Sequence, residues 1–151
     1  MIKWKMLYAD YDQDTGISKV WIRTEIGTFS GTAYLHDEDR DIASNFEGCR
    51  YAEMRAVIKY VHTKVKTLKV KYSALLDVDN SFKATKPYVE NKYTRILDNK
   101  LNNLDNQIKD LELYEEKLKQ SLYYQMSNYR KAKEILNKKI EEGRKQEPES
   151  K

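Results

Sequence analysis

The stretch from Thr94 to about Glu142 carries a heptad pattern, and no other feature restricts the possible folds of this chain as strongly. Alternating steps of four and three give twelve seam positions, of which ten are apolar: Leu97, Leu101, Leu104, Ile108, Leu111, Glu115, Leu118, Leu122, Gln125, Tyr129, Ala132 and Leu136. Neither Pro nor Gly occurs from residue 93 to residue 142. This 3.5-residue apolar repeat predicts one long helix that packs along a partner helix.

The predicted helix is too long to fit inside a small globular domain. At about 1.5 Å per residue it would reach roughly 70 Å, which exceeds the width of such a domain. The helix must therefore protrude, fold back once, or pair with another chain. We expect it to pair, so that the seam from 97 to 136 forms the interface of a homodimer.

The first part of the chain predicts a small antiparallel sheet covered by a helix. Three segments rich in β-branched and aromatic residues, 2–9, 17–24 and 28–36, are separated by turn residues. Three strands are too few to be stable alone, so the apolar stripe of a second predicted helix, 49–72, is expected to cover one face. Residues 73–92 contain Asp, Asn, Ser and Pro, and they predict a connection with short helical pieces.

These elements together predict an α+β fold: a small antiparallel sheet with a packed helix and a long C-terminal coiled-coil-like helical extension. We expect residues 1–92 to form the sheet-plus-helix body, which would hold any ligand. Residues 93–142 would form the dimerisation extension, and the polar residues 143–151 a disordered tail.

Composition excludes a membrane span and an internal disulfide. Mean hydropathy is −0.87, and no apolar run approaches the roughly twenty residues that a transmembrane helix needs. Cys49 is the single cysteine, which fits a reducing cytoplasm. The N-terminus has no apolar h-region, so we expect no secretory signal.

Positive charge concentrates in the middle of the chain. Residues 51–92 carry nine basic and four acidic side chains, and the charged residues from Arg55 to Lys71 are all basic. Such a run usually forms a solvated helix face, but it could also bind phosphates.

Motifs for catalysis or metal binding are weak or absent. No glycine-rich phosphate loop, dinucleotide fingerprint, nucleophile elbow or zinc-ligand spacing occurs. Cys49 with His36 or His62 could be imagined as a nucleophile and base, and the acidic loop 36–41 as a metal site. A small residue at a helix start and a solvated loop are simpler interpretations. We therefore expect a binding protein rather than an enzyme, with no catalytic residue, metal or cofactor.

Two aromatic residues in a polar setting suggest where a ligand would bind. Phe82 and Tyr88 lie close in sequence to several cations and an amide, namely Lys83, Lys86, Asn91 and Lys92. Rings, cations and an amide are what a nucleotide-like ligand needs. The alternative is that Phe82 plugs the base of the long helix.

Residues 27–60 resemble a family of small phage proteins. The segment contains Gly-Thr-Phe-Ser-Gly-Thr-Ala, then an acidic loop, Asp-Ile-Ala-Ser, Gly-Cys and Ala-Glu-Met-Arg-Ala. In this order the motifs resemble the Thoeris anti-defence protein one family, phage sponges for the cyclic ADP-ribose signals that bacterial TIR enzymes make.

The resemblance implies a function and an assembly. Family members form homodimers through their helical extensions, and the dimers can assemble into hexamers. They sequester glycocyclic ADP-ribose in the host bacterial cytoplasm without cleaving it, and some also bind cyclic oligonucleotides at separate sites. The competing interpretation is a structural or nucleic-acid-binding phage coiled-coil protein; under the sponge interpretation we expect no stable nucleic-acid partner.

The resemblance also implies site residues. Phe82 matches the aromatic that the family places against the adenine ring, and Asn91 is the best candidate for an amide contact, with Lys92 beside it. Arg55, in the Ala-Glu-Met-Arg-Ala motif, and Arg95, at the start of the long helix, are candidate pyrophosphate partners because arginine binds phosphate through two parallel hydrogen bonds.

Overall fold

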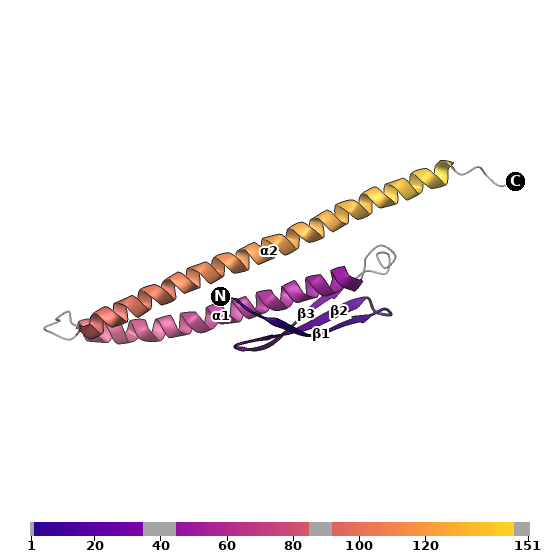
Figure 1. Ribbon diagram of the computed structural model, residues 1–151. Coiled ribbons are helices and arrows are strands. Elements are labelled where there is room, and N and C mark those ends of the chain that lie inside the picture. Colours follow the sequence, from indigo (N-terminus) through magenta and orange to yellow (C-terminus); the bar gives the residue numbers. More distant parts are fainter. Residues whose placement is uncertain (1, 35–44, 85–91, 147–151) are drawn as a thin grey trace.

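The computed structural model describes residues 2–34, 45–84 and 92–146. It contains three strands and two helices: β1 (Lys5–Asp12), β2 (Ile17–Thr24), β3 (Gly27–Tyr34), α1 (Asn45–Ala84) and α2 (Lys92–Gln146). Figure 1 shows the sheet against the first part of α1 and α2 running back along the other side of that helix. The predicted α+β fold with a long C-terminal helix is confirmed. Neither described helix has an apolar stretch long enough to cross a membrane.

The sheet is an antiparallel meander in the order β1-β2-β3, as predicted. Gly16 and Gly27 end the two turns with φ values of 69° and 139°. Residues that carry a side chain rarely adopt such positive values, so glycine suits both positions. The Gly16 N–H donates to the Asp12 carbonyl at 2.8 Å, and this bond closes the first turn. Alternation along β2 places Ser18, Val20 and Ile22 on the face toward α1, where all three are buried.

The core lies between this sheet face and the first half of α1. Its fully buried members include Val20, Ile22, Ala52, Ala56, Val57, Tyr60 and Val61. The helix approaches β3 so closely that a Cβ on Gly31 would lie 1.8 Å from the Ala52 carbonyl oxygen and 2.6 Å from the Ala56 nitrogen. Two helical alanines and a strand glycine therefore form the contact between the two layers.

Cations of α1 cap the edge of the sheet at β3. Arg55 Nη1 donates to the Thr32 carbonyl at 2.7 Å, and Lys59 Nζ donates to the Ser30 carbonyl at 2.9 Å. These residues are four apart, so both side chains leave the helix on the same face. They satisfy backbone acceptors that an edge strand would otherwise present to another chain.

The first helix is longer than the sequence predicts. It continues from the expected end at residue 72 to Ala84, so the prediction of an irregular connection is wrong for residues 73–84. Leu75, Leu76 and Asp79 are shielded in this extra segment. Packing against α2 outweighs the weak helix propensity of the Asp, Asn and Ser residues there. Residues 85–91 lie outside the described part of the chain.

The second helix folds back on the first, and this fills the first half of the predicted seam within one chain. Ion pairs mark the antiparallel register: Lys69–Glu112 at 2.8 Å and Lys83–Asp98 at 3.5 Å. Leu101 and Ile108 are each 7% exposed. The expectation that another chain covers the whole seam is therefore wrong for its first half. The helix ends at Gln146, so residues 143–146 are helical rather than part of a disordered tail, and residues 147–151 lie outside the described chain.

Glu25, in the turn between β2 and β3, ties the sheet to α1. Its carboxylate accepts hydrogen bonds from the Tyr60 hydroxyl and from Lys64 Nζ, the latter at 2.6 Å. Burial raises the pKa of Glu25, but the hydrogen bonds from Lys64 and Tyr60 outweigh it and lower the pKa from 4.5 to about 2. A lowered carboxyl pKa stabilises the fold above pH 4.5, and this stabilisation is lost as the pH falls from 4.5 toward 2.

Glu25→Gln is expected to lower the free energy of unfolding at pH 7 by about 1 kcal/mol or less, because solvent screens an ion pair at a side chain that is 48% exposed. The difference between wild type and variant should shrink as the pH falls from 4.5 toward 2, where the wild-type carboxylate becomes protonated. Urea denaturation across this pH range measures it. A difference that stays constant with pH would contradict the role given to Glu25.

Candidate functional site

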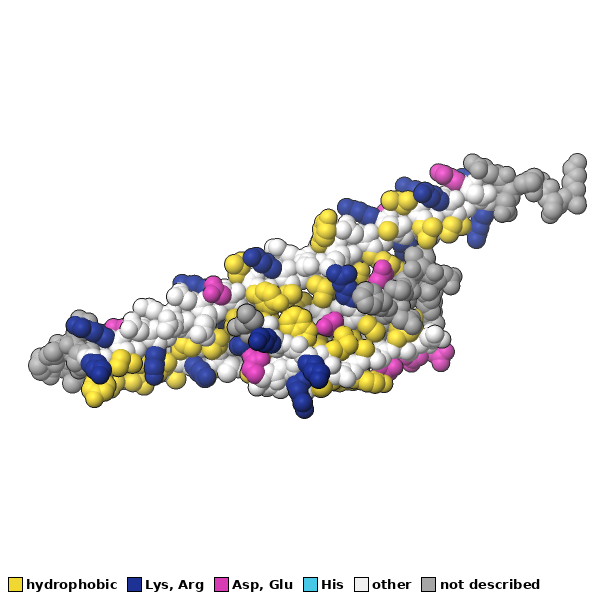
Figure 2. All heavy atoms as spheres, viewed as in Figure 1, with side chains coloured by type: hydrophobic (Ala, Val, Ile, Leu, Met, Phe, Trp, Pro, Cys, Tyr) yellow, Lys and Arg dark blue, Asp and Glu magenta, His cyan; other side chains and the backbone are white. Residues whose placement is uncertain are grey.

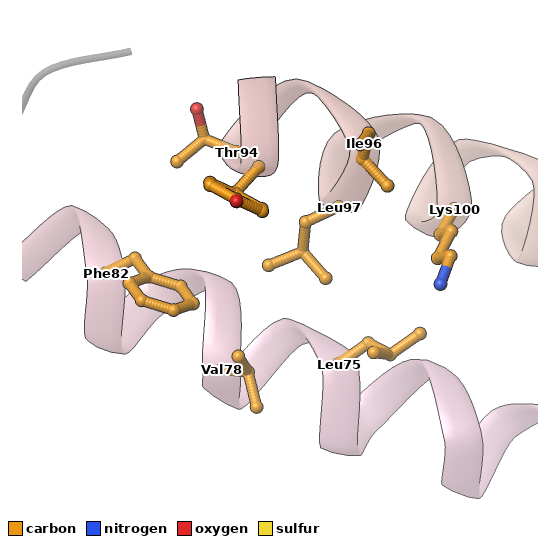
Figure 3. Close-up of a pocket in the computed structure, with 8 residues that line it drawn as sticks. Leu75, Val78, Phe82, Thr94, Ile96, Leu97 and Lys100 are labelled. Carbon is orange, nitrogen blue, oxygen red and sulfur yellow. The ribbon is translucent and has the colours of Figure 1, made fainter. Parts of the chain in front are cut away.

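The end of the helical hairpin, where α1 ends and α2 begins, carries a groove of about 330 Å³. Such a volume is at the small end of the range for ligand sites in proteins. Eight residues line the groove: Leu75, Val78 and Phe82 from α1, and Tyr93, Thr94, Ile96, Leu97 and Lys100 from α2. Figure 3 shows the two helices as opposite walls, with Leu97 pointing between them.

Helical spacing explains why these residues form the walls. Leu75, Val78 and Phe82 are three and four residues apart, so they share one face of α1. The lining residues of α2 follow the same spacing. The groove therefore exists because two apolar helix faces meet at the hairpin end without closing completely.

The groove walls expose more apolar surface than a helix contact normally leaves. Phe82 is 54% exposed, Tyr93 78%, Val78 45% and Ile96 42%. Contiguous exposed apolar groups mark sites of ligand or partner binding. The rings of Phe82 and Tyr93 give this site two aromatic surfaces with low ordering cost, which suit a flat heterocycle.

Two lysines near the groove differ in their surroundings, since one forms ion pairs and the other lines the groove. Lys83 donates to the Asp79 carboxylate at 2.8 Å and lies 3.5 Å from Asp98. The hydrogen bond with Asp79 raises the pKa of Lys83, so this cation is held in ion pairs. Lys100 lines the groove itself and brings a positive charge next to the apolar walls. A ligand with a ring and an anionic group matches this combination.

The structure places some of the predicted site residues at the groove and not others. Phe82 forms part of the wall of the groove, and its contact with a ligand stays a prediction. Lys92 and Arg95 lie in the first turn of α2, are exposed, and are not among the residues that line the groove. Tyr88 and Asn91 lie outside the described residues, so their predicted roles stay predictions.

Phe82 lies at the base of the long helix, as the alternative interpretation expects, but its ring fills that place only in part. A ring that is more than half exposed contributes only part of its burial energy to the fold. The core cluster of the described chain is formed by other residues, from Val20 to Ile108. The ligand-contact interpretation of Phe82 is therefore the one that its position favours.

Arg55 does not belong to the groove. It lies 27 residues before Phe82 on the same helix, which separates the two by about 40 Å. Its guanidinium donates to the Thr32 carbonyl and contacts the Met126 sulfur at 4.0 Å. The prediction that Arg55 and Phe82 contact one ligand is wrong within one chain, because the intervening residues are a single straight helix rather than a connection that could fold back.

Sequence reasoning missed Tyr93 and Lys100 as groove residues. Both belong to the long helix, whose heptad pattern drew attention to Leu97 and the other seam positions. The spacing from Tyr93 to Lys100 is seven residues, and Tyr93, Ile96 and Lys100 share one helix face. That spacing is the signal that could have shown an aromatic and a cation next to the seam.

The other chemical hypotheses find no support in the described residues. Cys49 and His62 are both on α1, separated by about 20 Å, so they are not a nucleophile and base pair. His62 instead has Nδ1 3.1 Å from Glu115 Oε1, a contact that helps fix the register of the two helices. No group of three or more His, Cys, Asp or Glu side chains is placed to hold a metal ion in residues 2–34, 45–84 and 92–146. His36 and the acidic loop lie outside these ranges.

Comparisons of the chain with models of protein families, with curated proteins and with solved structures found no match in any of the three.

Proposed function

We propose that this protein is a phage-encoded sponge, which binds glycocyclic ADP-ribose made by bacterial TIR enzymes and holds it without cleavage in the host cytoplasm. The resemblance of residues 27–60 supports this proposal from the sequence side. The single structural observation behind it is the exposed Phe82 ring in the groove at the hairpin end.

The groove offers contacts that suit the parts of such a ligand. The adenine ring would stack on Phe82, with Tyr93 as a second aromatic surface. The pyrophosphate would lie toward Lys100, which takes the role that the sequence assigned to Arg55. Arg95 lies five residues before Lys100 on the same helix but does not line the groove, so its role as a pyrophosphate partner stays a prediction from the resemblance.

Calorimetry with a panel of cyclic ADP-ribose isomers tests this proposal. We expect one isomer to bind tightly, with an affinity that changes little between low and moderate salt. Stacking and shape complementarity contribute to this affinity together with charge, and salt weakens only the contribution of charge. Linear ADP-ribose is the matched control, since it keeps the adenine and pyrophosphate but lacks the closed ring. Equal binding of both, or of neither, would contradict selectivity for the cyclic signal.

We further propose a homodimer through the second half of α2. Beyond Leu118 this helix carries apolar residues with no cover from the described part of the chain: Leu136 is 38% exposed, Ile140 45% and Ile135 57%. Leu136 continues the seam that α1 fills up to Leu118, and Ile135 and Ile140 lie beside it on the helix. A second copy is the proposed occupant because the same heptad register runs through both halves. Association into hexamers and binding of cyclic oligonucleotides stay predictions from the resemblance.

Replacing Leu136 and Ile140 with Glu is expected to turn the dimer into a monomer, because association would bury four unpaired carboxylates. The melting temperature of the monomer should change little, since both side chains are exposed in the single chain. Light scattering and thermal unfolding measure the two quantities. Leu113→Glu is the matched control, because Leu113 is 56% exposed and lies off the seam.

A dimer that persists in the Leu136 and Ile140 double variant would contradict this interface. Leu104 and Ile108, which the sequence alone would select for such a test, are unsuitable. They pack on α1 of the same chain, so charges there would disrupt the hairpin rather than dissociate two copies.

The exposed half-seam also favours a second candidate function, a phage structural protein that assembles through α2. Such a protein would form the same dimer but would take up no cyclic signal. The calorimetric titration therefore separates the two functions, whereas the oligomeric state alone does not.

A further inference from the structure

The face of the sheet that points away from α1 carries aromatic and basic side chains at one end. Register places directly opposite residues on the same face, so the row of β2 residues Lys19, Trp21 and Arg23 lies beside Lys5 and Tyr8 of β1. Tyr8 is 58% exposed, and no helix or strand of the described chain packs over this face. We name this set of five residues the outer-face patch.

One residue pair in the outer-face patch places two like charges opposite each other. Lys5 lies directly opposite Arg23 on the neighbouring strand. Like charges in this position repel each other and destabilise a sheet. It is the only such pair of like charges in the described register of the three strands, whereas Asp10 opposite Lys19 is the usual favourable arrangement. A local cost in stability of this kind commonly marks a functional surface.

The aromatic part of the patch lies next to this pair of cations. The ring centroids of Tyr8 and Trp21 are 5.4 Å apart and the rings are tilted by 46°, while Lys19 Nζ lies 5.0 Å from the centre of the Trp21 ring. The two rings are adjacent on neighbouring strands, so successive bases could stack on them. Exposed aromatic side chains on a sheet, flanked by cations, are how several protein modules bind single-stranded nucleic acid.

We propose that the outer-face patch binds a short segment of single-stranded nucleic acid. Bases stack on Tyr8 and Trp21, and phosphates lie between Lys5 and Arg23, whose mutual repulsion the anion relieves. Asp10 and Asp12 follow on the same strand face and repel a backbone that runs further, so the site holds about two or three nucleotides. In Figure 2 dark blue side chains project from the lower rim of the sheet, and magenta ones gather toward the turn that joins β1 and β2.

This inference is independent of the proposed sponge function. The patch belongs to the sheet, and the groove at Phe82 belongs to the opposite end of α1 (Figure 1). The proposed patch differs from the expectation, made from the sequence, that this protein has no stable nucleic-acid partner. It also differs from the alternative in which the basic run of α1 binds phosphates, since Lys59 and Lys64 of that run are engaged with Ser30 and Glu25.

Fluorescence titration with an eight-nucleotide thymidine oligomer at low salt tests the proposal. The Trp4→Phe variant leaves Trp21 as the only tryptophan, and its fluorescence should be quenched when a base stacks on it. In this background Tyr8→Ala is expected to weaken binding by about 5- to 150-fold, which corresponds to the stacking of one base. Ala9→Ser, on the other face of β1, is the matched control and should bind normally.

Lys5→Gln distinguishes a binding patch from a merely structural one. Removing the like charge should raise the melting temperature, yet it should weaken oligomer binding and reduce the slope of log affinity against log salt by about 0.7. Lys138→Gln on α2 is the control for a general loss of charge, and it should leave affinity nearly unchanged. The absence of quenching, equal loss from Lys138→Gln, or equally tight binding of a duplex would each overturn the proposal. A change of oligomeric state in Tyr8→Ala without any oligomer binding would assign the patch to a protein contact and would overturn it too.

Discussion

Gly31→Ala is expected to destabilise the protein by about 3 kcal/mol, the upper end of the usual range for overpacking. The added methyl group would lie 1.8 Å from the Ala52 carbonyl oxygen and 2.6 Å from the Ala56 nitrogen. Both are backbone atoms of α1, so no side-chain rotation relieves the clash and the helix must move away from β3. The movement would also lengthen the hydrogen bonds from Arg55 and Lys59 to the β3 edge. Thermal unfolding should show a fall of about 6–12 °C.

Gly143→Ala is the matched control for this prediction. An added Cβ at residue 143 has open space around it, and the position is helical. Alanine is the better helix former by about 1 kcal/mol, so this variant should be as stable as wild type or slightly more stable. Equal melting temperatures for the Gly31 and Gly143 variants would show that α1 and β3 are not in the described contact.

Phe82→Ala is expected to weaken binding of a glycocyclic ADP-ribose by about 5- to 150-fold, because it removes a stacking surface worth about 1–3 kcal/mol. The melting temperature should stay near that of wild type, since the ring is already 54% exposed in the single chain. Burial of a ring in the core would instead cost about 3–5 kcal/mol on truncation. Calorimetric affinity and thermal unfolding on the same preparation separate the two effects.

Two further variants sharpen the test of Phe82. Leu113→Ala truncates a side chain of similar exposure, 56%, outside the groove, and it should leave affinity unchanged. Lys100→Gln should weaken binding if the anionic group lies where the groove places its cation. A Phe82→Ala variant with reduced melting temperature and undiminished affinity would assign the ring to the fold rather than to the ligand.

The sheet and the existence of both helices follow from the sequence because their signals are local. Turns containing Gly16 and Gly27 separate period-two segments, and the apolar stripe from Tyr51 onward has helical spacing. The length of α1 does not follow in the same way. Asp77 and Asn80 are typical of a connection, and contact with α2, a helix later in the chain, stabilises this segment as a helix.

The heptad pattern identifies the residues of a helix contact but not the helix that makes it. Leu101 and Ile108 are buried positions of the seam, as expected, yet the helix that packs against α2 is α1 of the same chain. The pattern cannot distinguish a hairpin from a dimer, since both bury the same face. The hairpin forms because α1 extends to Ala84 and so lies along the first half of the seam. This extra length of α1 was not predictable from the sequence.

Only part of the candidate site could be predicted, because local sequence patterns do not show which helices pack together. Phe82 was identified because an aromatic ring in a polar segment needs an explanation, and that argument uses local sequence alone. Arg55 was added for its charge and its place in the Ala-Glu-Met-Arg-Ala motif, and neither shows that one continuous helix holds it about 40 Å from Phe82 within one chain. Lys100 and Tyr93 depend on the pairing of two helices, and only the assembled hairpin brings them opposite Phe82.

The most direct test of the sponge proposal is to incubate the protein with the product of a TIR enzyme, remove unbound molecules by gel filtration, and heat-denature the complex. Mass spectrometry of the released material should show intact cyclic ADP-ribose in an amount close to one molecule per groove. The Phe82→Ala variant, treated in parallel, should release much less. Recovery of a cleaved product would show an enzyme instead, and recovery of no nucleotide from folded wild-type protein would contradict the proposed function.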